Sequence, residues 1–241
     1  MEQTLYYVIL AYFILGAIAF FLIAKKKPGA ERKNIWSKYF TYLVIIHALY
    51  GSIYFGPPFF SLLAALIVLA GYIELVRVRW KFGESGHHRF FTLSLLTFSL
   101  FAIPFILFSF AEKPLLYFVF VVVAVFDAFS QISGQLWGRK KLAPTISPGK
   151  TIGGLVGGAV LAIITGGLMS ELTDTNLTKS LLFATIIIIF AFCGDMLASW
   201  YKRQFGVKDF GTILPGHGGF LDRFDSLIPG GAAMYILNLM L

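Results

Sequence analysis

Apolar residues fill most of this chain in long runs that are separated by short polar segments. Each run approaches the roughly 20 residues that a helix needs to cross a bilayer. Pro57-Pro58 separates the second run from the third, and joining these two would give one segment too long for a single span. The pattern predicts an all-α helical bundle with about eight transmembrane helices, at residues 4–24, 39–56, 59–76, 90–110, 115–136, 152–170, 180–200 and 227–241.

Composition agrees with a polytopic integral membrane protein. Of the 241 residues, 58% are hydrophobic and 13% are charged, whereas a soluble globular domain has about 25% charged residues. No internal repeat, low-complexity tract or soluble domain interrupts the apolar runs. We expect a single membrane domain over residues 1–241, with N-terminal spans in 1–110 and with catalytic spans and a polar signature loop in 111–241.

The Lys and Arg residues gather in alternate loops of this arrangement. The loops at 25–38, 77–89, 138–150 and 199–226 hold 18 of the 20 Lys and Arg residues. Because cytoplasmic loops carry an excess of these residues, we expect the four loops on the cytoplasmic side and both termini outside. The net charge of +8 then reflects topology and attraction to anionic headgroups, and we expect no nucleic-acid partner.

The segment from Ser199 to Ser226 is far more polar than the rest of the chain. Its 28 residues include four Lys or Arg, three Asp, one His and five Gly. Glycines let backbone N–H groups approach a ligand, Lys and Arg pair with phosphates, and carboxylates suit Mg²⁺. The alternative is a loop that is basic only for topology, but such a loop needs no interleaved Asp and Gly. The segment therefore predicts a site for nucleotide chemistry with phosphates and magnesium.

Polar residues inside the apolar runs extend this candidate site into the membrane. Asp195, Ser199 and Lys202 have the spacing i, i+4 and i+7, which places them on one helix face. An ionisable residue within a span is a candidate functional residue, although Asp195 could instead form a structural salt bridge to a neighbouring helix. A second stripe, which we expect to face the bundle interior, contains Asp127, Gln131 and Gly134.

The segment before the 152–170 run is a second candidate for phosphate binding. Lys150 and Thr151 precede that run, and the N-terminus of a helix favours anions. A simple turn with a topogenic lysine is the alternative. Two overlapping G-x-x-x-G pairs follow and predict close helix packing. They consist of Gly153, Gly154, Gly157 and Gly158.

Two other residues receive structural predictions. Glu74 lies near the end of the third run and is expected to pair with Arg77 or Arg79 rather than to act in catalysis. Cys193 is the sole cysteine, so no intrachain disulfide forms, and we expect it to be a small buried apolar side chain.

The polar loop resembles the signature of the phosphatidate cytidylyltransferases, or CDP-diacylglycerol synthases. That signature combines Ser-x-x-Lys-Arg, Lys-Asp-x-Gly, Pro-Gly-His-Gly-Gly and Asp-Arg-x-Asp, and every element is present here in order. A match of about a dozen positions is far more specific than a lone glycine-rich loop. The matching residues are Ser199, Lys202 and Arg203; Lys208, Asp209 and Gly211; Pro215 to Gly219; and Asp222, Arg223 and Asp225.

The stretch 138–151 resembles the family's second block, which is built around Ser-Pro-x-Lys-Thr before a helix. Together the specific resemblance covers about residues 127–158 and 194–226. Many members have Tyr where Gln131 stands, Arg where Gln135 stands and Glu where Gly153 stands. The missing acid at position 153 leaves the exact lipid substrate open.

The resemblance implies CTP-dependent cytidylyl transfer to a lipid phosphate such as phosphatidate, giving CDP-diacylglycerol and pyrophosphate in a prokaryotic cell membrane. It implies Mg²⁺ held by Asp195 and Asp222, and it is compatible with a second cation and with a homodimer. The implied catalytic residues are Asp195, Lys202, Arg203, Lys208, Asp209, His217, Asp222, Arg223 and Asp225. The implied substrate-binding residues are Asp127, Lys150, Thr151, Ser199, Gly218 and Gly219.

Two other functions stay open at this point. One is a different CTP-using lipid enzyme, which cytidylylates an isoprenoid lipid phosphate or phosphorylates a polyprenol. The other is a non-enzymatic transporter or lipid-binding scaffold. Transporters often contain inverted repeats and pairs of broken helices, and no such internal symmetry is present in this sequence.

Overall fold

The computed structural model describes residues 28–82, 87–173, 175–211 and 218–240, with a few single residues between positions 6 and 25. Most of this part of the chain is helical, which confirms the all-α prediction. The helices are α2 (Gly29–Phe55), α3 (Pro57–Phe82), α4 (His88–Phe108), α5 (Lys113–Trp137), α6 (Ile152–Leu168), α7 (Leu177–Gln204), α8 (Leu221–Phe224) and α9 (Leu227–Leu239). Between α5 and α6, β1 (Lys141–Ala143) and β2 (Ser147–Thr151) form an antiparallel hairpin, and the 3-10 helix η2 (Ser170–Thr173) precedes α7.

Each predicted span from residue 39 onward corresponds to a helix, but α2 begins at Gly29, inside the predicted loop 25–38, and α3 extends to Phe82, beyond its predicted end at 76. Within the described residues, α3, α4, α5 and α7 are long and apolar enough to cross a membrane, and shorter apolar helices occupy 39–55, 152–168 and 227–239. The predicted span 4–24 lies mainly outside the described residues. The break at Pro57-Pro58 is confirmed, because α2 ends at Phe55 and Gly56 turns the chain with φ 105°. Pro57 can then begin α3, since the first turn of a helix needs no N–H donor.

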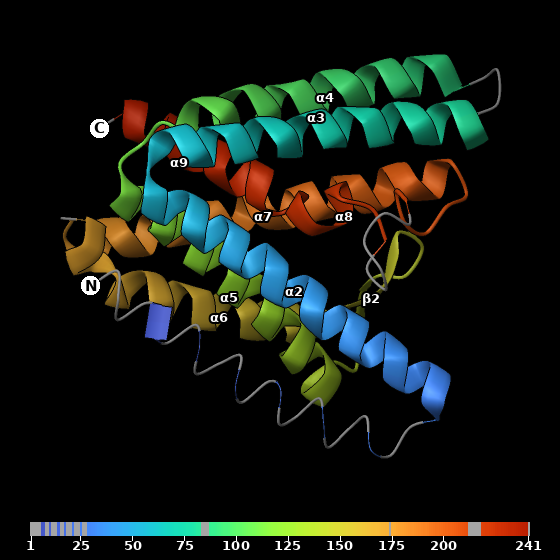
Figure 1. Ribbon diagram of the computed structural model, residues 1–241, viewed down its shortest axis with the longest axis horizontal. Coiled ribbons are helices and arrows are strands. Elements are labelled where there is room, and N and C mark those ends of the chain that lie inside the picture. Colours follow the sequence, from blue (N-terminus) through green and yellow to red (C-terminus); the bar gives the residue numbers. More distant parts are fainter. Residues whose placement is uncertain are drawn as a thin grey trace.

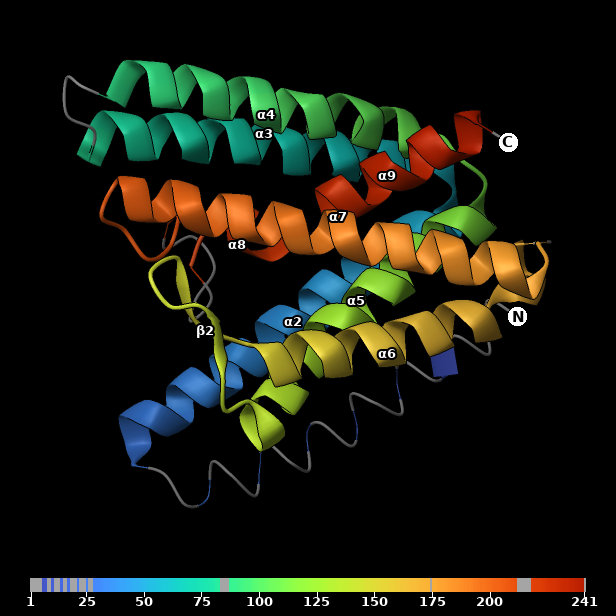
Figure 2. The same ribbon diagram turned by 180° about the vertical axis from the view of Figure 1, so that it is seen from behind.

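The described parts of the basic loops lie at one end of the bundle. Figure 1 shows the start of α2, the ends of α3 and α5, the β-hairpin and the end of α7 at the same end. The connections α2–α3, α4–α5 and α6–α7 lie at the opposite end, together with the last turn of α9 (Figures 1 and 2). The structure therefore groups the basic loops as the charge pattern predicts.

Helices α5 and α6 pack side by side through glycines (Figure 2). A Cβ atom on Gly154 would lie 2.6 Å from the Ser130 carbonyl oxygen, and one on Gly158 would lie 2.7 Å from the Phe126 carbonyl oxygen. Small residues allow this close backbone approach in membrane helices. The predicted glycine packing is confirmed, and it fixes the β-hairpin that leads from α5 into α6.

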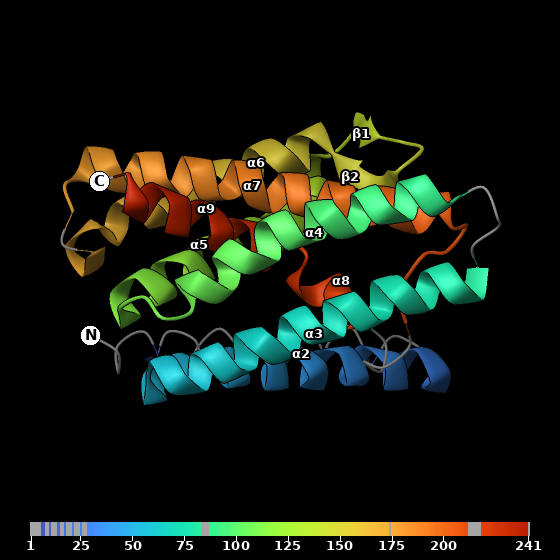
Figure 3. The same cartoon turned by 90° about the horizontal axis from the view of Figure 1, so that it is seen from above.

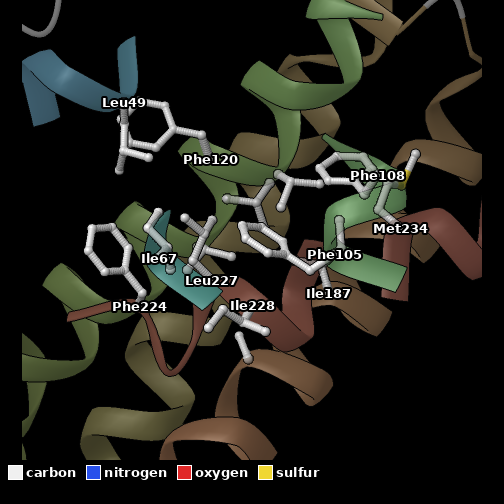
Figure 4. Packing of buried hydrophobic residues seen from close by; sticks show 14 of the residues in the cluster. Leu49, Ile67, Phe105, Phe108, Phe120, Ile187, Phe224, Leu227, Ile228 and Met234 are labelled. Carbon is white, nitrogen blue, oxygen red and sulfur yellow. The ribbon is translucent and has the colours of Figure 1, made fainter. Parts of the chain in front are cut away.

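The buried core surrounds the start of α9. Figure 4 shows Phe105 of α4, Ile187 of α7 and Leu227 and Ile228 of α9 within one group of buried side chains. All four side chains are at most 7% exposed. Because van der Waals packing stabilises helix contacts in lipid, this core holds the junction between α8 and α9, which carries the predicted site residue Asp225.

Cys193 contradicts the prediction that it is buried, because its side chain is exposed. It lies on the same face of α7 as Ile189 and Trp200, which are 53% and 41% exposed. The sequence contained a signal for this, because Cys193 lies on the side of α7 opposite Asp195 and Lys202, which form the polar face of this helix.

Candidate active site

The site is built around Asp222, at the start of α8. One carboxylate oxygen of Asp222, Oδ1, accepts a hydrogen bond from Lys202 Nζ at 2.6 Å, and the other, Oδ2, accepts the backbone N–H groups of Phe210 and Gly219 at 2.8 Å each. The side chains of Lys202 and Asp222 are 9% and 4% exposed. Removing one partner of such a buried pair typically costs about 3–5 kcal/mol. The end of α7 and the start of α8 are therefore joined by a charge pair.

Gly218 shapes the turn that precedes Asp222. Its backbone has φ 87°, which an L side chain rarely adopts. A Cβ atom there would also lie 2.8 Å from Asp222 Oδ2 and 2.9 Å from the Cβ of Asp209. The glycine therefore brings the backbone close to both acids, as the glycine-rich composition of the loop predicts.

Glu74 of α3 binds the backbone of the turn that leads into α8. Its side chain is 1% exposed, and its two oxygens accept the backbone N–H groups of Phe220 and Leu221 at 2.7 Å each. A Cβ atom on Gly219 would lie 2.6 Å from Glu74 Oε1, so the turn needs a residue without a side chain. Glu74 thereby fixes the backbone that carries Asp222.

The prediction that Glu74 pairs with Arg77 or Arg79 is wrong. Arg77 is exposed, and Arg79 contacts His88 at 3.3 Å. Glu74 lies on the buried side of α3, next in sequence to the buried Leu75. The sequence did contain a signal for it, because an ionisable residue in an apolar span is by default a candidate for function.

Asp195 lies on α7, one turn before Ser199, and forms an ion pair with Lys150 of β2. Ser199 is buried, and its hydroxyl donates to Asp195 Oδ1 across a long 3.5 Å. The side chains of Lys150 and Asp195 are 24% and 27% exposed. The alternative prediction for Asp195 is a structural salt bridge to a neighbouring helix. Asp195 does form a salt bridge, but its partner, Lys150, belongs to the β-hairpin.

Gly194 has a packing role beside Asp195. A Cβ atom on Gly194 would collide with the Asp225 carbonyl oxygen and with the Pro229 ring. The Gly-Asp pair of α7 therefore lets the α8–α9 junction contact α7 directly. This contact brings the backbone of Asp225 against the helix that carries Asp195.

Two further acids lie close to this centre. Asp127 Oδ1 accepts a hydrogen bond from the Ser226 hydroxyl at 3.3 Å, which links α5 to the α8–α9 junction. Burial raises the pKa of Asp225 well above its usual range, and the carboxylates of Asp195, Asp127 and Asp222 raise it further, whereas Lys202 lowers it. This concentration of negative charge favours a bound cation.

Two residues predicted to contact phosphate also make contacts within the protein. Thr151 is buried, and its Oγ1 accepts the N–H of Gly154 at 3.1 Å, so it caps α6. Arg203 donates from Nε to the Ile146 carbonyl at 3.0 Å and from Nη1 to the Val207 carbonyl at 2.8 Å. Arg203 thereby ties the β-hairpin to the turn after α7.

Among the remaining predicted residues that the structure describes, one contacts α2 and two are exposed. Arg223 donates to the Tyr42 hydroxyl at 3.0 Å, and its guanidinium lies 5.9 Å from the centre of the Tyr42 ring. Helix α2 thus contributes a contact that sequence reasoning missed. Lys208 and Asp209 are exposed, and His217 lies outside the described residues.

The donor set fits a particular mode of metal binding. Among the residues that the structure describes, no three His, Cys, Asp or Glu side chains form a group that could hold a metal by themselves. Mg²⁺ is usually held by one or two carboxylates together with substrate phosphates rather than by a cage of protein ligands. Asp195 and Asp222 each already accept a cationic ammonium group, so both positions suit a positive charge.

Fold and site together define a polytopic membrane protein with interleaved acids and bases at one end of its bundle. The chain matches the model of the Cytidylyltransferase family over residues 3–241. It belongs to this family, which confirms the resemblance seen in the sequence and makes it a member of a class of nucleotide-using enzymes.

Several curated proteins with similar sequences are phosphatidate cytidylyltransferases. The phosphatidate cytidylyltransferase of Staphylococcus haemolyticus (strain JCSC1435) is 38% identical over 186 residues, which cover 75% of this chain and 68% of the relative. That of Staphylococcus aureus (strain COL) is 34% identical with the same coverage. That of Staphylococcus epidermidis is 43% identical over 126 residues, covering 52% of this chain and 47% of the relative.

Proposed function

We propose that this protein transfers the cytidylyl group of CTP to phosphatidate, giving CDP-diacylglycerol and pyrophosphate. The observation that carries the proposal is the pair of neighbouring acid–base contacts, Lys202 with Asp222 and Lys150 with Asp195. In each contact a carboxylate, which suits a cation, lies beside an ammonium group, which suits a phosphate, and this supports the proposal. Membership of the cytidylyltransferase family and the names of the relatives support the same reaction.

The reaction joins two polyanions, and its chemistry needs no protein nucleophile. A phosphate oxygen of phosphatidate attacks the α-phosphorus of CTP, the bond from that phosphorus to the bridging oxygen breaks, and pyrophosphate leaves. The phosphate monoester is already anionic at neutral pH. The main barrier is charge repulsion, which preorganised cations reduce.

Different residues bind phosphate, hold the metal ion and position the loops. Lys150 and Lys202 bind phosphate groups of CTP and lipid, and Arg223 and Lys208 add cationic donors. The N–H of Gly219 is bonded to Asp222, so this glycine acts by positioning that acid. Asp195 and Asp222 would hold Mg²⁺, which supplies charge neutralisation at the transferring phosphoryl group when bound. Glu74 and Arg203 hold the two loops in place through backbone contacts.

The orientation in the membrane follows from the same charges. We place the end of the bundle that carries the β-hairpin and α8 in the cytoplasm, because the Lys and Arg residues gather there. CTP then reaches the site from the cytoplasm, and phosphatidate reaches it from the surrounding bilayer.

A panel of acceptors tests the proposal against its alternatives. Purified protein is incubated with CTP, Mg²⁺ and, separately, phosphatidate, a polyprenol phosphate and a polyprenol. Phosphatidate should give CDP-diacylglycerol and an equal amount of pyrophosphate. CDP-polyprenol as the main product would move the protein to isoprenoid lipids, and polyprenyl phosphate with CDP would identify a kinase. The absence of pyrophosphate with both phosphate acceptors would overturn the proposal.

A further inference from the structure

A cavity of about 320 Å³ lies between α4 and α7, next to the α8–α9 junction. Its walls are two helix stripes with regular spacing, so each helix presents one continuous face. The α4 stripe consists of Phe90, Leu93, Ser94, Thr97, Phe98 and Phe101. The α7 stripe consists of Gly194, Leu197, Ala198 and Tyr201.

A pair of aromatic rings lies at each end of this cavity. Near the basic loops, the Phe90 ring lies 5.0 Å from that of Trp200, and further along the helices Phe101 lies 6.2 Å from Phe190. Leu93 and Trp200 line the cavity and are also 62% and 41% exposed. The cavity therefore reaches the outer surface of the helices, which in a membrane protein faces lipid.

The hydroxyl groups that line the cavity on α4 have no donor left for a hydrogen bond to a ligand. The Ser94 hydroxyl donates to the Phe90 carbonyl at 2.8 Å, and the Thr97 hydroxyl donates to the Leu93 carbonyl at 2.9 Å. Both donors are therefore used within α4. The remaining lining is almost entirely aliphatic and aromatic, so the cavity suits a hydrocarbon.

The inner wall of the cavity belongs to the candidate active site. Gly194, Asp225 and Pro229 form part of it, and Gly194 directly precedes Asp195. Figure 3 shows α8 between α3 and α4, with α9 running from there beside α7 toward the end opposite the basic loops. A molecule in the cavity would therefore lie next to the cluster of carboxylates.

We infer that this cavity receives one acyl chain of the lipid phosphate substrate, which enters sideways from the bilayer between α4 and α7. The inference rests on the proposed function. A volume near the lower end of the roughly 300–1,000 Å³ of ligand pockets suits a single chain rather than two. The headgroup of a lipid held here lies toward Asp225 and the basic end, where the phosphate is needed.

Selectivity in this cavity comes from shape. The bilayer and the cavity are both apolar, so transfer of a chain between them gains little hydrophobic free energy, and packing decides whether it binds. Filling the cavity with a larger side chain should therefore exclude a long chain and leave a short one unaffected.

Thr97→Phe tests this, with Thr92→Phe as the matched control. Both threonines lie on α4 and bond to their own helix, but Thr92 is exposed and does not line the cavity. Overpacking of this kind corresponds to roughly a tenfold or larger loss of binding. We expect Thr97→Phe to raise KM for dioleoyl phosphatidate about tenfold, with KM for dihexanoyl phosphatidate and for CTP unchanged, and Thr92→Phe to change none of these. Equal effects on both lipids, or no effect, would overturn the inference.

A photo-crosslinking experiment gives a readout that does not depend on turnover. A phosphatidate with a diazirine along one acyl chain should label peptides from 88–108 and 194–204 in the wild type and lose most of this labelling in Thr97→Phe. Labelling here without formation of CDP-lipid would refute the proposed function and retain the cavity. Formation of CDP-lipid with labelling confined to other helices would refute the cavity and retain the function.

Discussion

Glu74→Gln tests most sharply how the bundle positions the candidate active site. The substitution preserves the shape of the side chain but replaces one carboxylate oxygen with an NH₂ group. Because the two oxygens of Glu74 accept the N–H groups of Phe220 and Leu221, the amide must oppose one donor with another. The turn that carries Asp222 then loses one of its two anchors on α3.

The magnitude follows from the type of bond. A hydrogen bond to a charged group contributes about 1.5–3 kcal/mol, and a buried donor without an acceptor adds a further cost. If this loss appears as misplacement of Asp222, kcat should fall roughly ten- to hundredfold. The Mg²⁺ concentration needed for half-maximal rate should rise, because Asp222 would hold the ion less well.

The assay combines turnover with amide hydrogen exchange. Exchange in the peptide covering 218–226 should accelerate in Glu74→Gln, whereas peptides from α5 and α6 should keep their protection. Tyr72→Phe is the matched control, because it removes a 2.7 Å hydrogen bond from α3 to Ser99 of α4 without touching α8. Wild-type turnover, wild-type Mg²⁺ dependence and unchanged exchange in Glu74→Gln would refute the positioning role.

Three further predictions follow from the site and the topology. Asp222→Asn should lower the formation of CDP-diacylglycerol by orders of magnitude while the protein still inserts in the membrane; near-normal turnover would remove Asp222 from the metal site. Gly194→Ala should reduce activity and thermal stability together, because the added methyl group collides with the Asp225 carbonyl oxygen. An unchanged melting temperature would contradict the close contact between α7 and the α8–α9 junction. In intact cells that express the protein without Cys193, a cysteine that replaces Gln204 should react only with membrane-permeant thiol reagents. A cysteine that replaces Thr175 should also react with impermeant reagents; the reverse pattern would invert the orientation.

Most of the fold was predictable because it depends on local composition. Apolar runs give helices from 39 onward, Pro57 marks the break between α2 and α3, and the spacing of Gly154 and Gly158 predicts the close contact with α5. Helix faces were harder to predict. Cys193 lies outward, on the side of α7 opposite Asp195 and Lys202, so the polar face of this helix was the informative pattern and the general tendency of cysteine to be buried was misleading.

The site was predictable in its residue types but not in its contacts. Lys202 and Asp222 belong to the same polar segment of the sequence, and their pairing spans 20 residues. By contrast, Glu74 contacts Phe220 across 146 residues of chain and Tyr42 contacts Arg223 across 181. Such contacts depend on how helices pack, which the local pattern around each residue does not contain.

The same limit applies to the contacts of Thr151 and Arg203 within the protein. Thr151 is positioned where either a phosphate or the first turn of α6 is within reach of its hydroxyl, and the structure assigns it to the N–H of Gly154. Arg203 has several donors, and two of them are used by the carbonyls of Ile146 and Val207. A motif gives the chemistry that a side chain offers, whereas the surrounding fold decides which partner receives it.

The fate of the phosphates of CTP tests the central claim most directly. Purified protein is incubated with phosphatidate and Mg²⁺, using CTP labelled at the α-phosphorus in one reaction and at the γ-phosphorus in another. Cytidylyl transfer predicts α-label in the extracted lipid and γ-label in pyrophosphate, with both signals lost in Asp222→Asn. Appearance of the γ-label in the lipid, no lipid label from the wild type, or equal labelling by Asp222→Asn would contradict the account.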